Sequence, residues 1–281
     1  MVNILSIDLE GSIEGKSAIY KQNELVGEEI SSIYEINKNL DIILEFFNQH
    51  KVKATFFILS RIIQDAPEIG KRILSENHEV ASHGYRHIFI DRMSDNEIDE
   101  YIYKSKALIE DKLGIEVLGF RAPFFSVCNK KEKIFDSLIE NGFIYDSSIF
   151  PISGHDLYGC NWKHLNTPKK MRNGLIEMPM STIKIIGKNI PTLGGGYLRL
   201  FPLFFSKFSI AHLNKNFKPG VIYMHPYEIG ENYREYRDSN FLQKVRFYRN
   251  IGRNTRYKLV NLFDTYQFST HIDYLRQNNL L

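Results

Sequence analysis

Short apolar runs alternate along the chain with longer stretches in which apolar residues recur three and four positions apart. The apolar runs predict strands at residues 3–8, 54–59, 79–82, 117–121, 143–146, 175–180 and 221–225. The helical spacing predicts helices at residues 30–50, 61–76, 95–113, 131–141 and 201–216, and a mainly helical tail from about residue 240. Pro67 is expected to start a second segment within the helix over 61–76. Residues 154–173 are polar and irregular, which predicts a long loop.

The helix predicted over 95–113 has the clearest ends. Ser94 is a suitable N-cap, Glu97 follows three positions later as in a capping box, and Gly114 can end the helix. The repeated order of strand and helix favours an α/β fold with a parallel sheet. About seven such units are present, and a strand set of this kind that closes on itself would be a barrel. Barrel enzymes place their chemistry at the carboxyl ends of the strands.

Composition narrows the classes of protein that the chain can represent. Its 281 residues are 43% hydrophobic, enough for one large α/β domain or two small ones, and we expect a single domain over residues 1–281. A net charge of only +3 gives no support for a nucleic-acid partner. Cys128 and Cys160 form no motif that implies a disulfide. Neither a signal peptide nor a membrane span is visible, so the expected location is the cytoplasm.

The tail contains a basic run without acids, from Lys244 to Lys258. A solvated surface is the first interpretation of this helical extension. An anionic partner is the alternative, either a phosphorylated or lipid-linked carrier or the inner membrane, which the protein would contact peripherally. The oligomeric state is not predictable from these features.

Two histidines and two carboxylates form the strongest candidate site. His83 and His87 are four residues apart after the strand at 79–82, and Asp8 and Glu10 end the first strand. Alternation along an extended strand sends both carboxylates to the same side. We expect Glu10, His83 and His87 to bind a divalent metal and Asp8 to act as general base on a metal-bound water. The histidine spacing alone is more often structural, and Asp8 alone can be a helix N-cap.

Three further strand ends carry polar residues. Arg121 can hold Asp8 through a forked ion pair, although a surface ion pair is the alternative. His225 has a suitable pKa to protonate a leaving amine, and Asp146 is expected to hold its other ring nitrogen. Pro123 fixes the turn after Arg121, which leaves the N–H of Phe124 to face an oxyanion. The other histidines are expected to be structural or exposed: His50, His78, His155, His164, His212 and His271.

A glycine cluster at 194–196 precedes Tyr197. Three glycines allow close approach of the backbone, but the spacing of a dinucleotide-binding loop is missing. We expect a loop that lines the substrate entrance, with Tyr197 facing the substrate.

These motifs together resemble the polysaccharide deacetylase family with the NodB-homology domain. The resemblance covers about residues 3–270 and rests on four ordered motifs: Asp8-Leu9-Glu10, His83-Gly84-Tyr85-Arg86-His87, Arg121-Ala122-Pro123-Phe124 and Tyr223-Met224-His225. It implies a distorted barrel of seven strands and removal of an N-acetyl group from an amino sugar. It also implies a divalent metal, with Zn²⁺ expected and Co²⁺ or Ni²⁺ as alternatives. Many members have adjacent aspartates in the first motif, whereas here the carboxylate ligand falls on Glu10.

Two segments look like one branch of this family, found beside exosortase and exopolysaccharide genes. They are residues 194–202, and the run His225-Pro226-Tyr227-Glu228. The expected partner is therefore an N-acetylated saccharide of a surface polysaccharide or its precursor. Two alternatives stay open: an amidohydrolase that cleaves a C–N bond of a small non-sugar amide, and a saccharide-binding module without catalysis.

Overall fold

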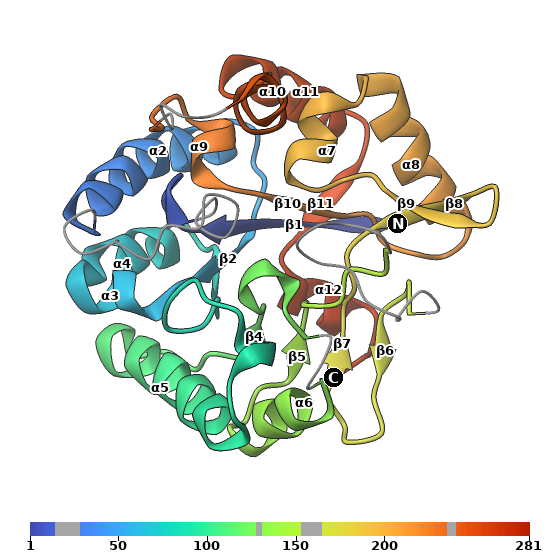
Figure 1. The fold of residues 1–281 in the computed structure, drawn as a ribbon. Coiled ribbons are helices and arrows are strands. Elements are labelled where there is room, and N and C mark those ends of the chain that lie inside the picture. Colours follow the sequence, from blue (N-terminus) through green and yellow to red (C-terminus); the bar gives the residue numbers. More distant parts are fainter. Residues whose placement is uncertain (15–28, 128–130, 153–164, 235–239) are drawn as a thin grey trace.

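The computed structural model describes residues 1–14, 29–127, 131–152, 165–234 and 240–281. Its main sheet is curled into a half-barrel with helices around the outside (Figure 1). The strands follow the order β10-β1-β2-β3-β4-β5-β7-β6, with β11 paired to β1. All these pairings are parallel except that of β6 with β7. The predicted α/β fold, a distorted barrel of mainly parallel strands, is therefore confirmed, and the sheet is curled into a half-barrel.

The elements have the following bounds. The strands of the main sheet are β1 (Val2–Leu9), β2 (Thr55–Ile58), β3 (Glu79–Ser82), β4 (Gly119–Phe120), β5 (Tyr145–Asp146), β6 (Lys169–Lys170), β7 (Ile176–Glu177), β10 (Val221–Met224) and β11 (Gln267–Ser269), and a separate hairpin consists of β8 (Thr182–Ile185) and β9 (Lys188–Pro191). The helices of the first half are α2 (Glu29–Gln49), α3 (Ser60–Asp65), α4 (Pro67–Ser75), α5 (Asp95–Leu113) and α6 (Lys131–Glu140), with single 3₁₀ turns η2 (Ile90–Arg92) and η3 (Pro123–Phe125). Those of the second half are α7 (Gly195–Leu200), α8 (Leu203–Lys215), α9 (Pro226–Ile229), α10 (Phe241–Tyr248), α11 (Arg253–Phe263) and α12 (His271–Gln277).

Alternation along the strands separates two apolar clusters. Leu5, Ile7 and Leu9 of β1 belong to the outer cluster, which the sheet forms with the surrounding helices. Ile4 and Phe57 belong to the inner cluster, together with Tyr274 and Leu275 of α12. Because neighbouring residues of a strand point to opposite faces, Ser6 and Asp8 face the inside of the half-barrel.

Most predicted elements are present, and the differences are local. Pro67 begins α4 as expected, and the Ser94–Glu97 capping box and left-handed Gly114 bound α5. Strands β4, β5 and β7 are shorter than predicted because only two residues of each pair with a neighbour.

Four strands were not predicted: β6 within the expected loop, the hairpin β8–β9, and β11 within the expected helical tail. The glycine cluster was predicted to be a loop, but Gly195 begins α7 instead.

Cys128, Cys160, His155 and His164 lie outside the described residues. None of the described helices combines the length and apolar character needed to cross a membrane.

Candidate active site

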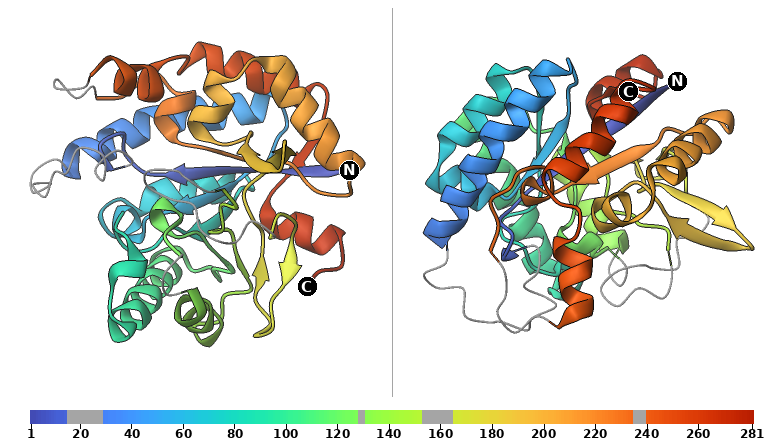
Figure 2. Two further views of the ribbon diagram at one scale, coloured as in Figure 1. Left: turned by 45° about the vertical axis from the view of Figure 1, so that its right-hand side comes forward. Right: turned by 90° about the horizontal axis from the view of Figure 1, so that it is seen from above.

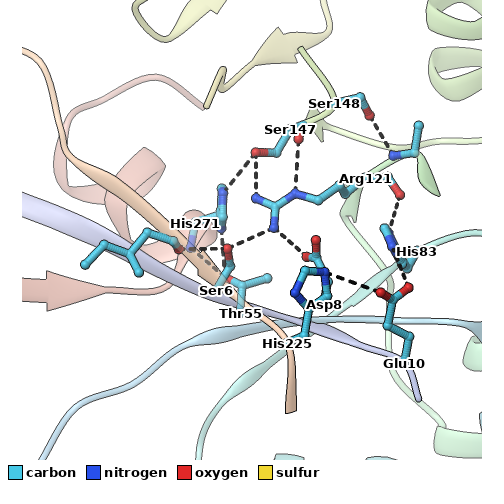
Figure 3. Close-up of polar contacts among 12 residues, drawn as sticks. Ser6, Asp8, Glu10, Thr55, His83, Arg121, Ser147, Ser148, His225 and His271 are labelled. Atoms are coloured by element: carbon cyan, nitrogen blue, oxygen red, sulfur yellow. Dashed lines mark hydrogen bonds and ion pairs between the residues drawn. The ribbon is translucent and has the colours of Figure 1, made fainter. Parts of the chain in front are cut away.

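Asp8 and Glu10 lie at the carboxyl end of β1 and are both buried. Each is surrounded by polar groups from neighbouring strand ends, as Figure 3 shows. The two carboxylates have different partners: Asp8 contacts an arginine, whereas Glu10 faces three histidines. These different partners agree with the predicted roles of Asp8 as general base and Glu10 as metal ligand.

Glu10, His83 and His87 converge on one point. Oε2 of Glu10 lies 2.6 Å from Nε2 of His87 and 3.8 Å from Nε2 of His83, and one ligand atom from each residue falls within a group no wider than 4.8 Å. Nδ1 of His83 lies 2.8 Å from the carbonyl oxygen of Arg121. If Nδ1 carries the proton and donates it to that carbonyl, the lone pair of Nε2 faces Glu10.

The surroundings of these three residues fit a divalent metal. Within the described residues, both carboxylate oxygens of Glu10 are buried without a well-formed hydrogen bond, although histidine nitrogens approach them closely. Burial lowers the pKa of His83 to about 4, which keeps its imidazole neutral. Burial would raise the pKa of Glu10, but the nearby His87, His225 and His83 lower it. An ionised carboxylate and a neutral imidazole both offer lone pairs. Groups of this kind that lie close together without a well-formed hydrogen bond between them are suitable ligands for a shared cation.

Gly84 places the second histidine of this set. Its φ is +82°, in the left-handed region, and an added Cβ would lie 2.2 Å from the hydroxyl oxygen of Tyr101. This turn redirects the chain between His83 and His87, so both rings face Glu10.

Arg121 fixes Asp8, as predicted. Its Nη1 lies 2.6 Å from Oδ1 of Asp8 and donates to Ser6 Oγ at 2.9 Å. Its Nε and Nη2 donate to the carbonyl and hydroxyl oxygens of Ser147 at 3.1 and 3.0 Å. The guanidinium is fully buried, with its Cζ 4.0 Å from the centre of the Phe57 ring, so a surface ion pair is excluded. A planar group held on several sides fixes the position of the carboxylate that it binds.

His225 faces the same space from the end of β10. Its Nε2 lies 3.3 Å from Oε1 of Glu10, and its Nδ1 lies 2.8 Å from Oε2 of Glu228. Burial would lower the pKa of His225, but the charge of Glu228 and its hydrogen bond raise the pKa to about 9. A protonated imidazole at this position is suited to donate a proton.

Glu228, which the sequence analysis did not assign, is held by a second buried charge. Its Oε1 lies 2.5 Å from Nε of Arg199, which also donates to the carbonyl oxygens of Arg246 and Arg249. Burial would raise the pKa of Glu228, but Arg199 and His225 lower it to about 2. Its place three residues after His225 was the available signal, because the short helix α9 turns the two side chains together.

Asp146 was expected to hold His225, and this prediction is wrong. Asp146 instead accepts a hydrogen bond from the Ser148 hydroxyl at 2.6 Å and pairs with Glu177 on β7. Burial raises the pKa of both carboxyl groups. The Ser148 oxygen accepts from the N–H of Ala122 at 2.7 Å. Asp146 therefore supports the turn after Arg121 rather than the imidazole.

His271 was expected to be merely structural or exposed, yet it contacts the network behind Asp8. Its Nε2 lies 3.3 Å from Ser147 Oγ, which binds Arg121, and its Nδ1 lies 3.0 Å from Thr55 Oγ1 (Figure 3). Burial lowers the pKa of His271 well below its usual value. No local sequence signal marks it, because the pairing of β11 with β1 brings it there.

The remaining predicted residues lie near the site with roles that stay predictions. Pro123 begins η3, and Phe124 has a left-handed φ of 54°. The Phe124 ring stacks on Phe89 with centroids 4.3 Å apart and contacts the ring of His87 at 4.1 Å. Tyr197 is half-buried in α7, near aromatic side chains rather than on a loop.

Two family models match the chain. Residues 32–138 match the model described as polysaccharide deacetylase, and residues 147–276 match a domain of unknown function, DUF3473. The first match supports a similarity to the polysaccharide deacetylase family over that region. His83 and Arg121 lie in the first matched region and His225 lies in the second, whereas Asp8 and Glu10 precede both. The candidate site therefore combines residues from both matched regions. Strands from both regions also pair within one sheet.

Individual relatives agree with this family. A peptidoglycan deacetylase of Helicobacter pylori is 31% identical over 107 residues, which are 38% of this chain and 36% of that protein. The crystal structure of a candidate polysaccharide deacetylase from Mycobacterium smegmatis has a TM-score of 0.64 at 15% identity, and the match covers 99% of this chain and 90% of that one. That of Puue allantoinase has a TM-score of 0.59 at 14% identity, with 98% and 90% covered.

The solved structures and the Helicobacter pylori relative support different conclusions about this chain. The two solved structures show the fold alone, and that fold serves enzymes with different names. The matched part of this chain spans 36% of the Helicobacter pylori protein, so the activity of that protein is a basis only for a proposal.

Proposed function

We propose that the protein is a metal-dependent deacetylase that removes the N-acetyl group from an amino sugar of a surface polysaccharide or its precursor. The observation that carries the proposal is the convergence of three sets of groups on one space: the Glu10–His83–His87 cluster, the Asp8–Arg121 pair and the His225–Glu228 pair. The deacetylase names of the relatives support the reaction class.

The residues divide the work of amide hydrolysis. Zn²⁺ is the proposed ion for Glu10, His83 and His87, and it would supply a Lewis acid that polarises the acetyl carbonyl and lowers the pKa of water. Asp8, fixed by Arg121, accepts the proton of the attacking water. His225 donates a proton to the amine nitrogen as the C–N bond breaks, which releases acetate and the free amino sugar.

A finer part of the proposal concerns the kind of polysaccharide. The two segments that look like the exopolysaccharide-associated branch are joined in the structure by the Arg199–Glu228 ion pair. This pair supports the view that both segments serve one function, the placement of His225. A cytoplasmic intermediate of polysaccharide assembly is the proposed substrate, and the cytoplasmic location stays a prediction.

The test is acetate release from N-acetylglucosamine oligomers by the zinc-loaded protein. Asp8→Asn should lower kcat by about 10²–10⁴-fold, because general base catalysis contributes that much, while zinc content stays unchanged. A parallel panel of small cyclic and linear amides tests the amidohydrolase alternative, which the allantoinase fold makes relevant. Turnover of such an amide without acetate release, or glycan binding without turnover, would contradict the proposal.

A further inference from the structure

The charges of the chain are strongly segregated. Residues 178–227 and 240–263 contain 12 of its 36 lysines and arginines and none of its 33 aspartates and glutamates. The remainder therefore has 24 basic and 33 acidic residues, an excess of nine acids, although the whole chain has a charge of only +3. The two acid-free segments form α7, α8, the hairpin β8–β9, α10 and α11, which gather in one part of the molecule (Figures 1 and 2).

This region also exposes large apolar side chains. One group, which we call the α8 face, consists of Phe204 and Phe208, four residues apart on α8, with Leu200 at the end of α7 and Phe217 just after α8. Phe204 is 73% exposed and Phe217 is 86% exposed. Scattered apolar residues are normal on a surface, but two exposed phenylalanines one turn apart on a helix, with further apolar side chains at its ends, indicate a site of interaction.

The tip of the hairpin β8–β9 adds a second apolar group beside the α8 face. Ile186 is 98% exposed and has a φ of +47°, a conformation that β-branched residues rarely adopt. Asparagine and glycine are the usual residues of such a turn, so an isoleucine there costs stability. The hairpin lies next to α8 in both views of the fold (Figures 1 and 2).

Lysines surround these apolar side chains. Lys184 and Lys188 flank the hairpin tip, and Lys207 and Lys215 lie on α8. Among the residues that the structure describes, none of these four lysines forms a salt bridge. Their long aliphatic stems can cover apolar surface while the ammonium groups reach outward.

Two basic residues of the tail bind other parts of the protein. Arg256 binds the carboxylate of Glu231 and the carbonyl oxygen of Ile229, each at 2.7 Å. Lys258 donates to three carbonyl oxygens near the end of α7: those of Leu198, Arg199 and Phe201. The Lys258 contacts tie α11 to the end of α7, and the Arg256 contacts tie it to the end of α9. The candidate surface for an anionic partner is therefore α8 and the hairpin tip rather than the tail alone.

We propose that the α8 face and the hairpin tip dock onto an anionic lipid bilayer. Exposed phenylalanines beside lysines are the combination that an interfacial surface requires, because the rings enter the boundary of headgroups and acyl chains while the lysines pair with lipid phosphates. The absence of acids over residues 178–227 removes any repulsion from the membrane along this part of the chain. The docking does not depend on the proposed reaction.

Co-sedimentation of the full chain with vesicles tests the proposal. The protein should bind vesicles that contain phosphatidylglycerol, and binding should weaken with salt and on neutral phosphatidylcholine vesicles. Lys207→Glu/Lys215→Glu should weaken binding at least about thirtyfold, since each lysine near an anionic surface contributes about 1 kcal/mol and each new carboxylate is repelled by the surface. Phe204→Ser/Phe208→Ser should weaken it about tenfold or more, because the rings can no longer insert.

Matched controls lie on exposed positions of α4 and α5, away from α8 in Figure 1. Lys71→Glu and Tyr103→Ser should bind vesicles as the unaltered chain does. Three results would overturn the proposal: no vesicle binding, equal loss in the control variants, or a dimer in light scattering that Phe204→Ser/Phe208→Ser dissociates. The last result would assign the surface to a second copy of the chain.

Discussion

Glu228→Gln tests how the protein holds His225. The substitution keeps the size of the side chain and removes its charge. In the structure Glu228 is 1% exposed and faces the Nε of Arg199 at 2.5 Å and the Nδ1 and backbone N of His225 at 2.8 and 2.9 Å. An amide cannot neutralise Arg199, and its NH₂ group cannot accept the proton of the imidazole.

Two separate effects follow from this geometry. Arg199 is 2% exposed and would lose its ionic partner, so we expect the free energy of unfolding to fall by about 3–5 kcal/mol. His225 would lose the group that orients its ring, so kcat should fall about 10–100-fold, as it does when partners of catalytic or ligand histidines are removed. The Glu10–His83–His87 cluster has no contact with Arg199 in the described residues, so zinc affinity should change little.

Urea unfolding and acetate-release kinetics measure the two effects, and a second variant separates them. Arg199→Met/Glu228→Gln removes both buried charges and should regain much of the lost stability. It should not regain kcat, because His225 still lacks its carboxylate. Wild-type kcat in both variants would refute the role of Glu228, and equal recovery of stability and kcat would show that its effect is purely structural.

Three further predictions concern other parts of the structure. Arg121→Lys should lower kcat about 10²-fold without altering zinc content, because a lysine cannot bind Asp8 and Ser147 together; kinetics and metal analysis check this. Gly84→Ala should lower the free energy of unfolding by about 1–3 kcal/mol, since φ is +82° there, and thermal unfolding measures it. Burial, followed by the charge of Lys53, lowers the pKa of His78 from 6.5 to about 4. The unfolded chain therefore binds more protons between these values, and up to about 3 kcal/mol of stability should be lost as the pH falls from 6.5 to 4. Urea titrations of His78→Gln across this range should show a shallower loss; an unchanged slope would exclude His78 as its source.

The sequence predicted the strand-end residues well for a physical reason. Parallel strands bring their carboxyl ends to one edge, so residues that follow strands far apart in the chain meet there. Asp8, Glu10, His83, Arg121 and His225 were placed by this rule, and the alternation along β1 put both carboxylates inside. The binding of Asp8 by Arg121 followed from charge and position alone.

The partners behind these residues could not be predicted in the same way. Asp146 does lie at a strand end, but its hydrogen bonds depend on Ser148 and on Glu177 of the adjacent strand. Glu228 needed the turn of α9, and His271 needed the pairing of β11 with β1 over Val2–Ile4. The short hairpin β8–β9 escaped prediction because its lysines and glycine interrupt the apolar pattern.

The proposed reaction requires that Glu10, His83 and His87 bind one divalent ion beside Asp8. Anomalous diffraction at the zinc edge, from crystals of the zinc-loaded protein, tests it most directly. We expect one zinc per chain on these three side chains, with the site lost in Glu10→Gln. Zinc bound elsewhere, or acetate release that persists in Glu10→Gln without any bound metal, would contradict it.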